Sequence, residues 1–419
     1  MTSYIDAPTK GLNAVVPASG DALPLNRPRI LSIQSRCIGH TTYARNMERM
    51  LADSDRSQID FHFMDEEREL PTRVLNRLGE LRIPGAWIRR QNLDLHRYRA
   101  EKSYGRMARR LIERKLLQHP YDVVHIQTQV GGYDAARLAR HIPFVVTADI
   151  TAVQVSQEST LPEYRWTYLP NIAVERELFA QCARCVFWSQ WSRDSYVRDL
   201  GGDPAKSCVI PPGTDVAAFP EWNRDRREET KRLPRILFVG GDFIRKGGQD
   251  LVTVFQERLA GKAILDLVTS SPLASDAQGV RVHRGVQAFT PEWMSLYEQA
   301  DIFALPSYFE GMPSSLVEAA AATLPIVATN INGIPEVVAN GTNGLTLAPG
   351  DCAALANALE TLVADPALRL RMGRAGRIAA ETKLNSALNF RRLEQVFLDV
   401  AAGSDAGSGK GVSIGREGN

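Results

Sequence analysis

The stretch from residue 300 to residue 351 constrains the fold of this chain more than any other part of it. Two short apolar runs, 302–306 and 326–329, are each bounded by a proline, which is typical of buried parallel strands. Between them lies a polar loop, 307–313, whose final proline suits the start of a helix. Residues 314–322 then follow and are rich in Ala, Leu and Glu. The order strand, loop, helix, strand predicts a βαβ unit of an open α/β sheet.

The loop and helix start of this unit combine an anion site with two carboxylates. Open α/β sheets bind ligands at the carboxyl edge of their strands, and the free amides of residues 311–316 at a helix N-terminus attract anions. Glu310 lies just before the helix and Glu318 one turn into it. Beside a phosphate, such carboxylates suit sugar or ribose hydroxyls. The alternative is that Glu318 is a solvated helix residue and Glu310 complements the helix dipole.

These residues carry a family resemblance. Glu310 and Glu318, separated by seven residues in PSYFEGMPSSLVEAAA, resemble the donor-site motif of the retaining glycosyltransferases of family 4 (glycosyl transferases group 1). The segment 236–248, ILFVGGDFIRKGG, resembles the first strand and phosphate loop of the same domain. The likeness covers about 30–402 and is more specific in the C-terminal half. Further family landmarks are Asn332, Gly333, Ile334, Pro335, Glu336, Gly341, Gly344, Pro349 and Asp351.

The resemblance implies an α/β protein of the GT-B fold. In this fold two doubly wound Rossmann-like domains face each other across a cleft, and a C-terminal helix crosses back to domain one. It also implies transfer of a sugar, with retention, from a nucleotide-diphosphate sugar to a glycan, lipid-linked or small-molecule acceptor. Cell-surface polysaccharide or glycoconjugate synthesis is the expected setting. The nucleotide-sugar is a co-substrate, and no cofactor or metal is expected because positive protein groups replace a metal.

On the donor side, the resemblance assigns the diphosphate to Lys246, with Arg245 as a second cation. Two glycines followed by two cations form a better phosphate grip than either pair alone. The catalytic residues predicted here are Glu310, Lys246 and Arg245. The predicted donor-binding residues are Gly240, Gly241, Gly311, Met312, Pro313, Ser314, Ser315, Leu316, Glu318 and Val286.

On the acceptor side, the resemblance points to Gly39, His40, His125 and Asp149. This chain departs from its relatives here, because they often carry histidines at the positions of Gln127 and Ala148. His125 lies within an apolar strand pattern, 122–127, and a packed core histidine is the alternative interpretation.

A basic segment stands out in the N-terminal half. Between residues 82 and 115 there are eleven Lys or Arg against three acidic residues, a local net charge of +8. The helical pattern at 101–117 gathers Arg106, Arg109, Arg110 and Arg114 opposite its apolar face. This segment is either a surface for anionic lipid headgroups or a phosphorylated acceptor, or a core helix with a solvated face.

Length and composition support this assignment. The 419 residues suit two domains, and a net charge of +2 gives no reason to expect a nucleic-acid partner. No apolar run is long enough to span a membrane, and the N-terminus lacks a signal pattern. Five scattered cysteines fit a reducing compartment. We therefore expect a cytoplasmic protein, in part peripheral on the inner face of the membrane.

The predicted division of the chain follows its composition. Residues 27–220 form the acceptor-binding domain, 233–384 form the nucleotide-sugar-binding domain, and 385–402 form the crossover helix. Residues 1–26 are a disordered leader, 221–232 a linker and 403–419 a flexible tail, because these stretches lack periodicity or are charged or rich in Gly and Ser.

Two other functions remain open at this stage. The first is a GT-B sugar-nucleotide epimerase or phosphorylase, which would use the same scaffold for another reaction. The second is a non-catalytic module that binds a nucleotide-sugar or a glycan.

Overall fold

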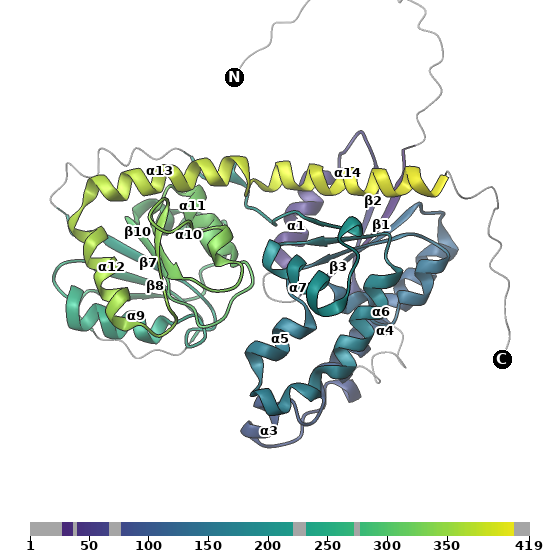
Figure 1. Ribbon diagram of the computed structural model, residues 1–419. Coiled ribbons are helices and arrows are strands. Elements are labelled where there is room, and N and C mark those ends of the chain that lie inside the picture. The colour runs from purple at the N-terminus through teal and green to yellow at the C-terminus, as the bar shows by residue number, and fades with distance from the viewer. Residues whose placement is uncertain (1–26, 37–39, 67–76, 221–231, 272–276, 406–419) are drawn as a thin grey trace, which may run out of the picture.

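The computed structural model describes residues 27–36, 40–66, 77–220, 232–271 and 277–405. It contains two six-stranded sheets whose strand pairs are all parallel, each covered by helices on both faces (Figure 1). The predicted GT-B arrangement of two Rossmann-like domains is therefore confirmed. The predicted leader, Gly39, nearly all of the predicted linker and residues 406–419 lie outside the described residues.

The N-terminal sheet has the strand order β2-β1-β3-β4-β5-β6. Most residues of β1, β3, β4 and β5 are buried because both faces of the sheet are covered, whereas the edge strands β2 and β6 are only partly buried. The strands are β1 (Arg29–Gln34), β2 (Gln58–Phe63), β3 (Val123–Gln127), β4 (Phe144–Ala148), β5 (Arg184–Phe187) and β6 (Ser207–Val209). The α-helices are α1 (His40–Leu51), α3 (Ala86–Arg90), α4 (His96–Gln118), α5 (Ala152–Ser159), α6 (Leu169–Gln181) and α7 (Gln190–Leu200). The 3-10 turns are η1 (Met64–Glu66), η2 (Gln129–Gly132), η3 (Ala136–Arg140), η4 (Pro162–Tyr168), η5 (Pro204–Lys206) and η6 (Val216–Ala218).

The C-terminal sheet has the strand order β12-β11-β10-β7-β8-β9. Its strands are β7 (Arg235–Val239), β8 (Ile264–Val268), β9 (Val280–His283), β10 (Ile302–Leu305), β11 (Ile326–Thr329) and β12 (Gly344–Leu347). Its helices are α9 (Gly248–Val254), the π-helical turn η7 (Phe255–Leu259), α10 (Pro291–Gln299), α11 (Ser314–Ala321), the 3-10 turn η8 (Ile334–Glu336), α12 (Cys352–Ala364) and α13 (Pro366–Thr382). The unit β10–α11–β11 lies where the apolar runs and prolines predicted it.

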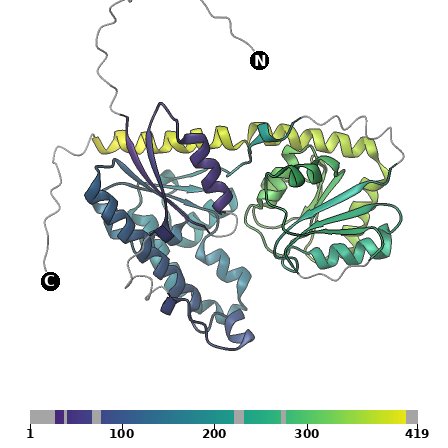
Figure 2. The ribbon, with the colours of Figure 1, turned by 180° about the vertical axis from the view of Figure 1, so that it is seen from behind.

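The last helix, α14 (Ser386–Asp405), completes the N-terminal domain. Phe390, Leu393 and Phe397 are buried against Ile30 and Val145 of the sheet, together with α1. Their spacing of three and four residues puts them on one face of the helix. α13 and α14 follow each other along one edge of both domains in the two opposite views (Figures 1 and 2). The predicted crossover is thus present, but the helix extends to Asp405, so the expected tail does not begin at Gly403.

A carboxylate also ties the two domains together beside the cleft. Glu336, in η8, accepts hydrogen bonds from the backbone amides of Gln190 (2.8 Å) and Trp191 (3.0 Å) at the start of α7. Free amides at a helix start favour such a negative partner. The loop that carries Glu336 is in turn fixed to the donor side, because Asn332 Nδ2 donates to the Glu310 carbonyl oxygen at 3.0 Å.

Candidate active site

A cavity of about 560 Å³ lies between the two domains. The C-terminal domain supplies most of its lining, from the loops that follow β7, β8, β9 and β10. His40, Asp149 and Trp188 line it from the N-terminal domain. The predicted donor residues that line it are Gly240, Gly241, Arg245, Lys246, Val286, Glu310, Gly311, Met312, Pro313, Ser314, Ser315 and Glu318.

Two cations converge on one carboxylate in this cavity. Lys246 Nζ lies 2.6 Å and Arg245 Nη1 3.0 Å from Glu310 Oε1. Arg245 also reaches Asp242 Oδ2 at 3.0 Å through Nε, and the Glu310 side chain is almost fully buried. Glu310 therefore neutralises both cations and holds them in place at the edge of the cavity. A diphosphate would find two preoriented positive groups there.

The turn after β7 places the Lys246 side chain against the backbone of Gly240. A Cβ atom at Gly240 would lie 2.5 Å from Lys246 Cδ, so a side chain at this position would displace the lysine. This close approach explains the first glycine of the phosphate loop.

Glu318 lies deeper than the sequence pattern alone indicates. Burial raises its pKa to about 7, against the opposing effects of a hydrogen bond from Tyr297 and the positive charge of Lys246. The Tyr297 hydroxyl donates to Glu318 Oε2 at 2.8 Å. The interpretation of Glu318 as a solvated helix residue is therefore wrong. Its carboxyl faces the cavity and is poised to change protonation near neutral pH.

The start of α11 differs from the prediction at one residue. Leu316 is fully buried in the core, and its amide donates to the Pro313 carbonyl oxygen at 3.1 Å. It is not among the residues that line the interdomain cavity. Leu316 is thus a packing residue, and the candidate anion site comprises only the residues before it.

The N-terminal side of the cleft is marked by a histidine–aspartate pair. His40 Nε2 lies 3.5 Å from Asp149 Oδ2, and the imidazole stacks on Trp188 with ring centroids 5.0 Å apart. Burial acts to raise the pKa of Asp149, but its interactions with His40, a backbone hydrogen bond and the charge of Arg97 together outweigh this effect and lower it. Asp149, which the resemblance assigns to the acceptor side, thus lines the cavity as an anion.

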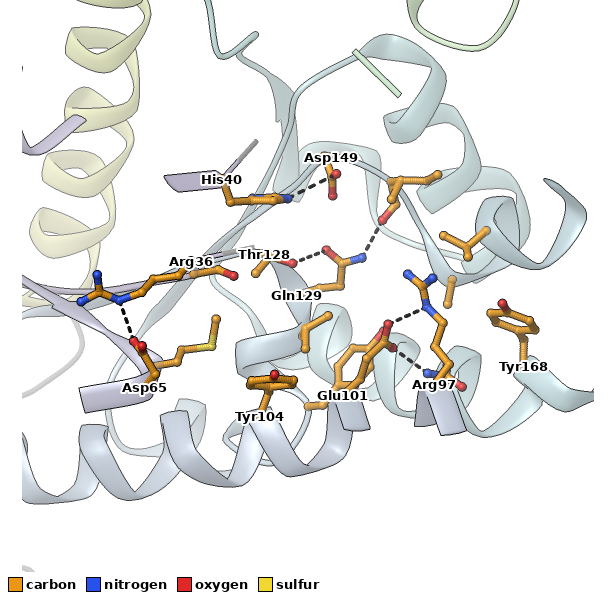
Figure 3. Close-up of a pocket in the computed structure, with 18 residues that line it drawn as sticks. Arg36, His40, Asp65, Arg97, Glu101, Tyr104, Thr128, Gln129, Asp149 and Tyr168 are labelled. Carbon is orange, nitrogen blue, oxygen red and sulfur yellow. Dashed lines mark hydrogen bonds and ion pairs between the residues drawn. The ribbon is translucent and has the colours of Figure 1, made fainter. Parts of the chain in front are cut away.

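A second cavity, of about 520 Å³, lies within the N-terminal domain and shares His40 and Asp149 with the first (Figure 3). Its walls come from η1, η2, η4, α4, α5 and α6 and from the loop after β1. Arg97 Nε and Glu101 Oε1 are 2.7 Å apart in its lining, and Arg36 Nε and Asp65 Oδ1 are 2.9 Å apart. The two cavities meet at the His40–Asp149 pair, so a group in each could approach the other there.

His125 does not belong to the acceptor side. It is fully buried in β3, where its ring nitrogens contact Ser32 Oγ and Thr147 Oγ1, both at 2.9 Å. Its ring packs on Phe397 of α14, and burial lowers its pKa to about 3. The histidine is therefore a neutral core residue.

Gln127 has a structural task at this edge. Its side chain accepts from the Ser35 amide at 3.1 Å and donates to the His40 carbonyl oxygen at 3.0 Å. It therefore fixes the two described ends of the first loop, and with them the position of His40.

Several lining residues escaped the sequence analysis. Arg97 and Glu101 form an i,i+4 pair in α4, but they were counted only as charges of the basic segment. Asn171, on α6, donates a hydrogen bond to Glu101 Oε2 at 2.7 Å. Trp188, in the other cavity, directly follows β5. The helical spacing of Arg97 and Glu101 was the one sequence signal for this part of the lining. Asn171 is distant in the sequence and contacts Glu101 only in the folded protein.

Two family models match the chain. The model described as Glycosyltransferase Family 4 matches residues 39–218, and that described as Glycosyl transferases group 1 matches 221–379. Together they cover most of the chain.

Individual relatives agree with these models. Glycogen synthase of Mycobacterium tuberculosis is 29% identical over 266 residues, which are 61% of this chain and 63% of the relative. UDP-Gal:alpha-D-GlcNAc-diphosphoundecaprenol alpha-1,3-galactosyltransferase of Escherichia coli is 26% identical over 309 residues, 68% of this chain and 77% of the relative. The match to the glycogen synthase thus spans less than two thirds of that relative's length.

The fold agrees as well. Sucrose-phosphate synthase from Thermosynechococcus elongatus superimposes with a TM-score of 0.69 at 18% identity, over 90% of this chain and 100% of that one. The two family models, the relatives and the two facing Rossmann-like domains all agree. The chain therefore belongs to the family 4 glycosyltransferases of the GT-B fold.

Proposed function

We propose that this protein transfers a sugar from a nucleotide-diphosphate sugar in the interdomain cavity to an acceptor held by the N-terminal domain. The observation that carries the proposal is the convergence of Lys246 and Arg245 on Glu310 beside the start of α11. The galactosyltransferase relative from Escherichia coli, which by its name uses UDP-Gal and a lipid-linked acceptor, supports the same class of donor.

In this proposal the diphosphate of the donor replaces Glu310 as the partner of Lys246 and Arg245. The diphosphate interacts with Lys246, Arg245 and the amides before Leu316, and Glu318 accepts hydrogen bonds from the ribose hydroxyls. As the bond from the sugar to the diphosphate breaks, negative charge grows on the leaving oxygens. Fixed cations stabilise that charge without reorganising, so the reaction needs no metal ion.

We further propose that the anomeric configuration is retained by departure and attack on the same face of the sugar. A double displacement would instead need a carboxylate nucleophile, and Asp149 is the N-terminal carboxylate placed where the two cavities meet. Mass spectrometry of the enzyme after reaction with a slow fluorinated donor distinguishes same-face transfer from double displacement. A glycosyl adduct on Asp149 would contradict same-face transfer.

Release of nucleoside diphosphate tests the main proposal. A transferase releases it in step with glycosylated acceptor, an epimerase releases none, and a binding module turns over nothing. A phosphorylase would instead consume or form a sugar phosphate. Thermal unfolding with UDP, GDP and ADP identifies the base beforehand, since a ligand at a hundred times its dissociation constant adds about 2.7 kcal/mol.

We also propose that the protein works in cell-surface glycan synthesis and contacts an anionic membrane surface through the segment 82–115. We propose a different place for this contact from the one first expected. Arg106, Arg109 and Arg110 were predicted to be exposed, but they are half-buried, and Arg109 lies 3.3 Å from Asp134. None of the helices in the described parts of the chain is long and apolar enough to cross a bilayer.

The exposed basic and apolar groups instead gather around α3 and η4. We call this region the tip; α3 lies at the end of the N-terminal domain that is far from α14 (Figure 1). Trp87 and Tyr164 join the two elements, with ring centroids 5.3 Å apart, and the Leu161 amide donates to Gln91 Oε1. Arg89 and Arg90 have no ion pair with any described residue. The exposed apolar side chains of the tip are Leu78, Leu81, Ile83, Trp87, Leu161, Trp166 and Leu169.

A further inference from the structure

The cavity inside the N-terminal domain carries information about the chemical class of the acceptor. Its volume of about 520 Å³ falls in the usual range of small-molecule sites, roughly 300–1,000 Å³. It opens toward the donor cavity at His40 and Asp149. If the proposed function holds, the acceptor hydroxyl reacts at that junction, and the rest of the acceptor's reacting unit occupies this cavity.

Both arginines in the described lining are already paired with a carboxylate, and the His40 ring lies next to one. Arg97 pairs with Glu101, Arg36 with Asp65, and His40 with Asp149 (Figure 3). The Arg97–Glu101 pair is close, at 2.7 Å, and Glu101 is largely buried. A phosphate at one of these pairs would face one cation per carboxylate, whereas in the donor cavity two cations, Lys246 and Arg245, share Glu310. Like charges so close repel, most strongly beside the largely buried Glu101.

The cavity offers a buried hydrogen-bond acceptor that has no partner in the described parts of the chain. Asn171 is fully buried, and its Oδ1 has no hydrogen-bond partner among the described residues. Its Nδ2 is already used, because it donates to Glu101 Oε2 at 2.7 Å. A buried acceptor without a partner is costly and is best satisfied by an O–H or N–H donor. A sugar hydroxyl supplies such a donor, whereas an ionised phosphate oxygen does not.

The remaining walls suit the C–H faces of a sugar ring. Met64, Val130, Ile150 and Val155 line the cavity together with the rings of Tyr104 and Tyr168, the last two labelled in Figure 3. Apolar walls with a few placed polar groups are the usual composition of such sites.

We propose that this cavity binds an uncharged, hydroxyl-rich sugar residue of the acceptor, and that Glu101 determines this specificity. Glu101 has two tasks. It accepts hydrogen bonds from the sugar, and its negative charge offsets that of Arg97 and so weakens the attraction of a phosphate to this cation. This inference deepens the proposed function, since it names the class of acceptor.

The test compares binding of neutral and phosphorylated sugars. The probes are the methyl glycosides of glucose, galactose, mannose and N-acetylglucosamine and the 6-phosphates of the same sugars, followed by saturation-transfer NMR on the full chain. We expect the wild type to bind at least one neutral glycoside more tightly than its 6-phosphate. Glu101→Gln should weaken the neutral sugar about tenfold or more, since a hydrogen bond to a charged group is lost. It should also strengthen binding of the 6-phosphate, because Arg97 is released.

A gain of phosphate binding is a result that mere destabilisation cannot produce. Glu113→Gln is the matched control, because Glu113 lies on the same helix and contacts Arg109 outside the cavity. A wild type that prefers 6-phosphates, that binds no neutral glycoside, or whose preference Glu101→Gln leaves unchanged would overturn the inference. Stabilisation by nucleoside diphosphate is measured on the same samples. Its loss would count against the proposed donor site, whereas its presence with failed sugar binding counts against this inference alone.

Discussion

The two domains share one architecture but build their cavities from different parts of it. In the C-terminal domain, Lys246, Glu310 and Glu318 lie on or next to two loops at the carboxyl edge of the sheet. In the N-terminal domain, Arg97, Glu101 and Asn171 extend from α4 and α6, far apart in the chain. The residues of the donor cavity are therefore close together in short sequence segments, whereas those of the N-terminal cavity come together only when the helices pack.

The largest expected effect belongs to the donor side. Lys246→Ala should reduce turnover thirty- to a thousandfold, on the order of 2–4 kcal/mol of transition-state stabilisation, because the developing charge on the diphosphate loses a fixed cation. Turnover at saturating donor measures the effect.

Lys262→Ala is the matched control for this substitution. Lys262 lies in the same domain, is exposed, and contacts only Glu360 among the acidic side chains described, at 3.6 Å. If Lys246→Ala turns over as fast as Lys262→Ala, the assignment of Lys246 to the donor site is wrong. The main contrast between the two domains would then be lost as well.

The second prediction compares one buried carboxyl from each domain. Burial raises the pKa of Glu318 to about 7 and that of Glu175 to about 8, from 4.5. Between pH 4.5 and these values the folded protein binds more protons than the unfolded chain, so stability falls as pH rises. Glu318→Gln should therefore match the wild type near pH 4.5 and exceed it above pH 7, by on the order of 2–3 kcal/mol.

Glu175→Gln should behave in the same way, with a window that extends to about pH 8. Glu175 accepts from the Ala152 amide at 2.7 Å, a bond that a glutamine oxygen can keep. Urea unfolding at several pH values measures both variants. A stability difference that does not change with pH would show that neither carboxyl is protonated in the folded protein.

A third, smaller effect separates the two donor carboxylates. Glu318→Ala should weaken binding of the bare nucleoside diphosphate by about 10- to 100-fold, because the ribose hydroxyls lose a charged acceptor. The family motif implies that Glu310 contacts the donor sugar, and the diphosphate replaces Glu310 as the partner of Lys246 and Arg245. Glu310→Ala should therefore act mainly on the intact sugar donor. Calorimetry with both ligands measures the split, and equal losses of nucleotide affinity in the two variants would refute it.

The contrast between domains also explains what could be predicted from the sequence. Pro306, Pro313 and Pro325 mark the borders of β10, α11 and β11, so this unit and its ligand residues were located from local pattern alone. The strands β6, β8 and β12 were not identified. β8 contains Asp266, whose charge interrupts the apolar run, although in the structure it pairs with Arg235 and His283, both at 2.8 Å.

The N-terminal site could not be assembled in the same way. Glu101 and Asn171 meet only because α4 and α6 pack side by side, and no spacing in the sequence encodes that contact. His125 was misassigned for the related reason that a strand histidine can point to the cavity or to the core. Only the packing of α14 on that face of the sheet decides for the core.

The last prediction concerns the surface rather than the cavities and has the smallest expected effect on folding. Of the two domains, the N-terminal one carries the tip, where Trp87 and Trp166 are each about half exposed and Arg89 and Arg90 are exposed as well. Each arginine near an anionic bilayer contributes about 1 kcal/mol, an effect that decays over a Debye length. Binding to phosphatidylserine vesicles should therefore weaken with salt, and it should fall in Arg89→Gln/Arg90→Gln and in Trp87→Ser/Trp166→Ser.

The control for these variants comes from the other domain. Ile378, on α13, is as exposed as the tip residues, so Ile378→Ser removes a comparable apolar group and should leave vesicle binding unchanged. Because the tip side chains are exposed, the midpoint of thermal unfolding should move little in the arginine variant. Vesicle sedimentation at low and high salt decides the matter. If the arginine and tryptophan variants bind as well as Ile378→Ser, or if the wild type ignores anionic vesicles at low salt, the tip is an ordinary solvated surface. A water-soluble acceptor would then fit the N-terminal cavity better than a lipid-linked one.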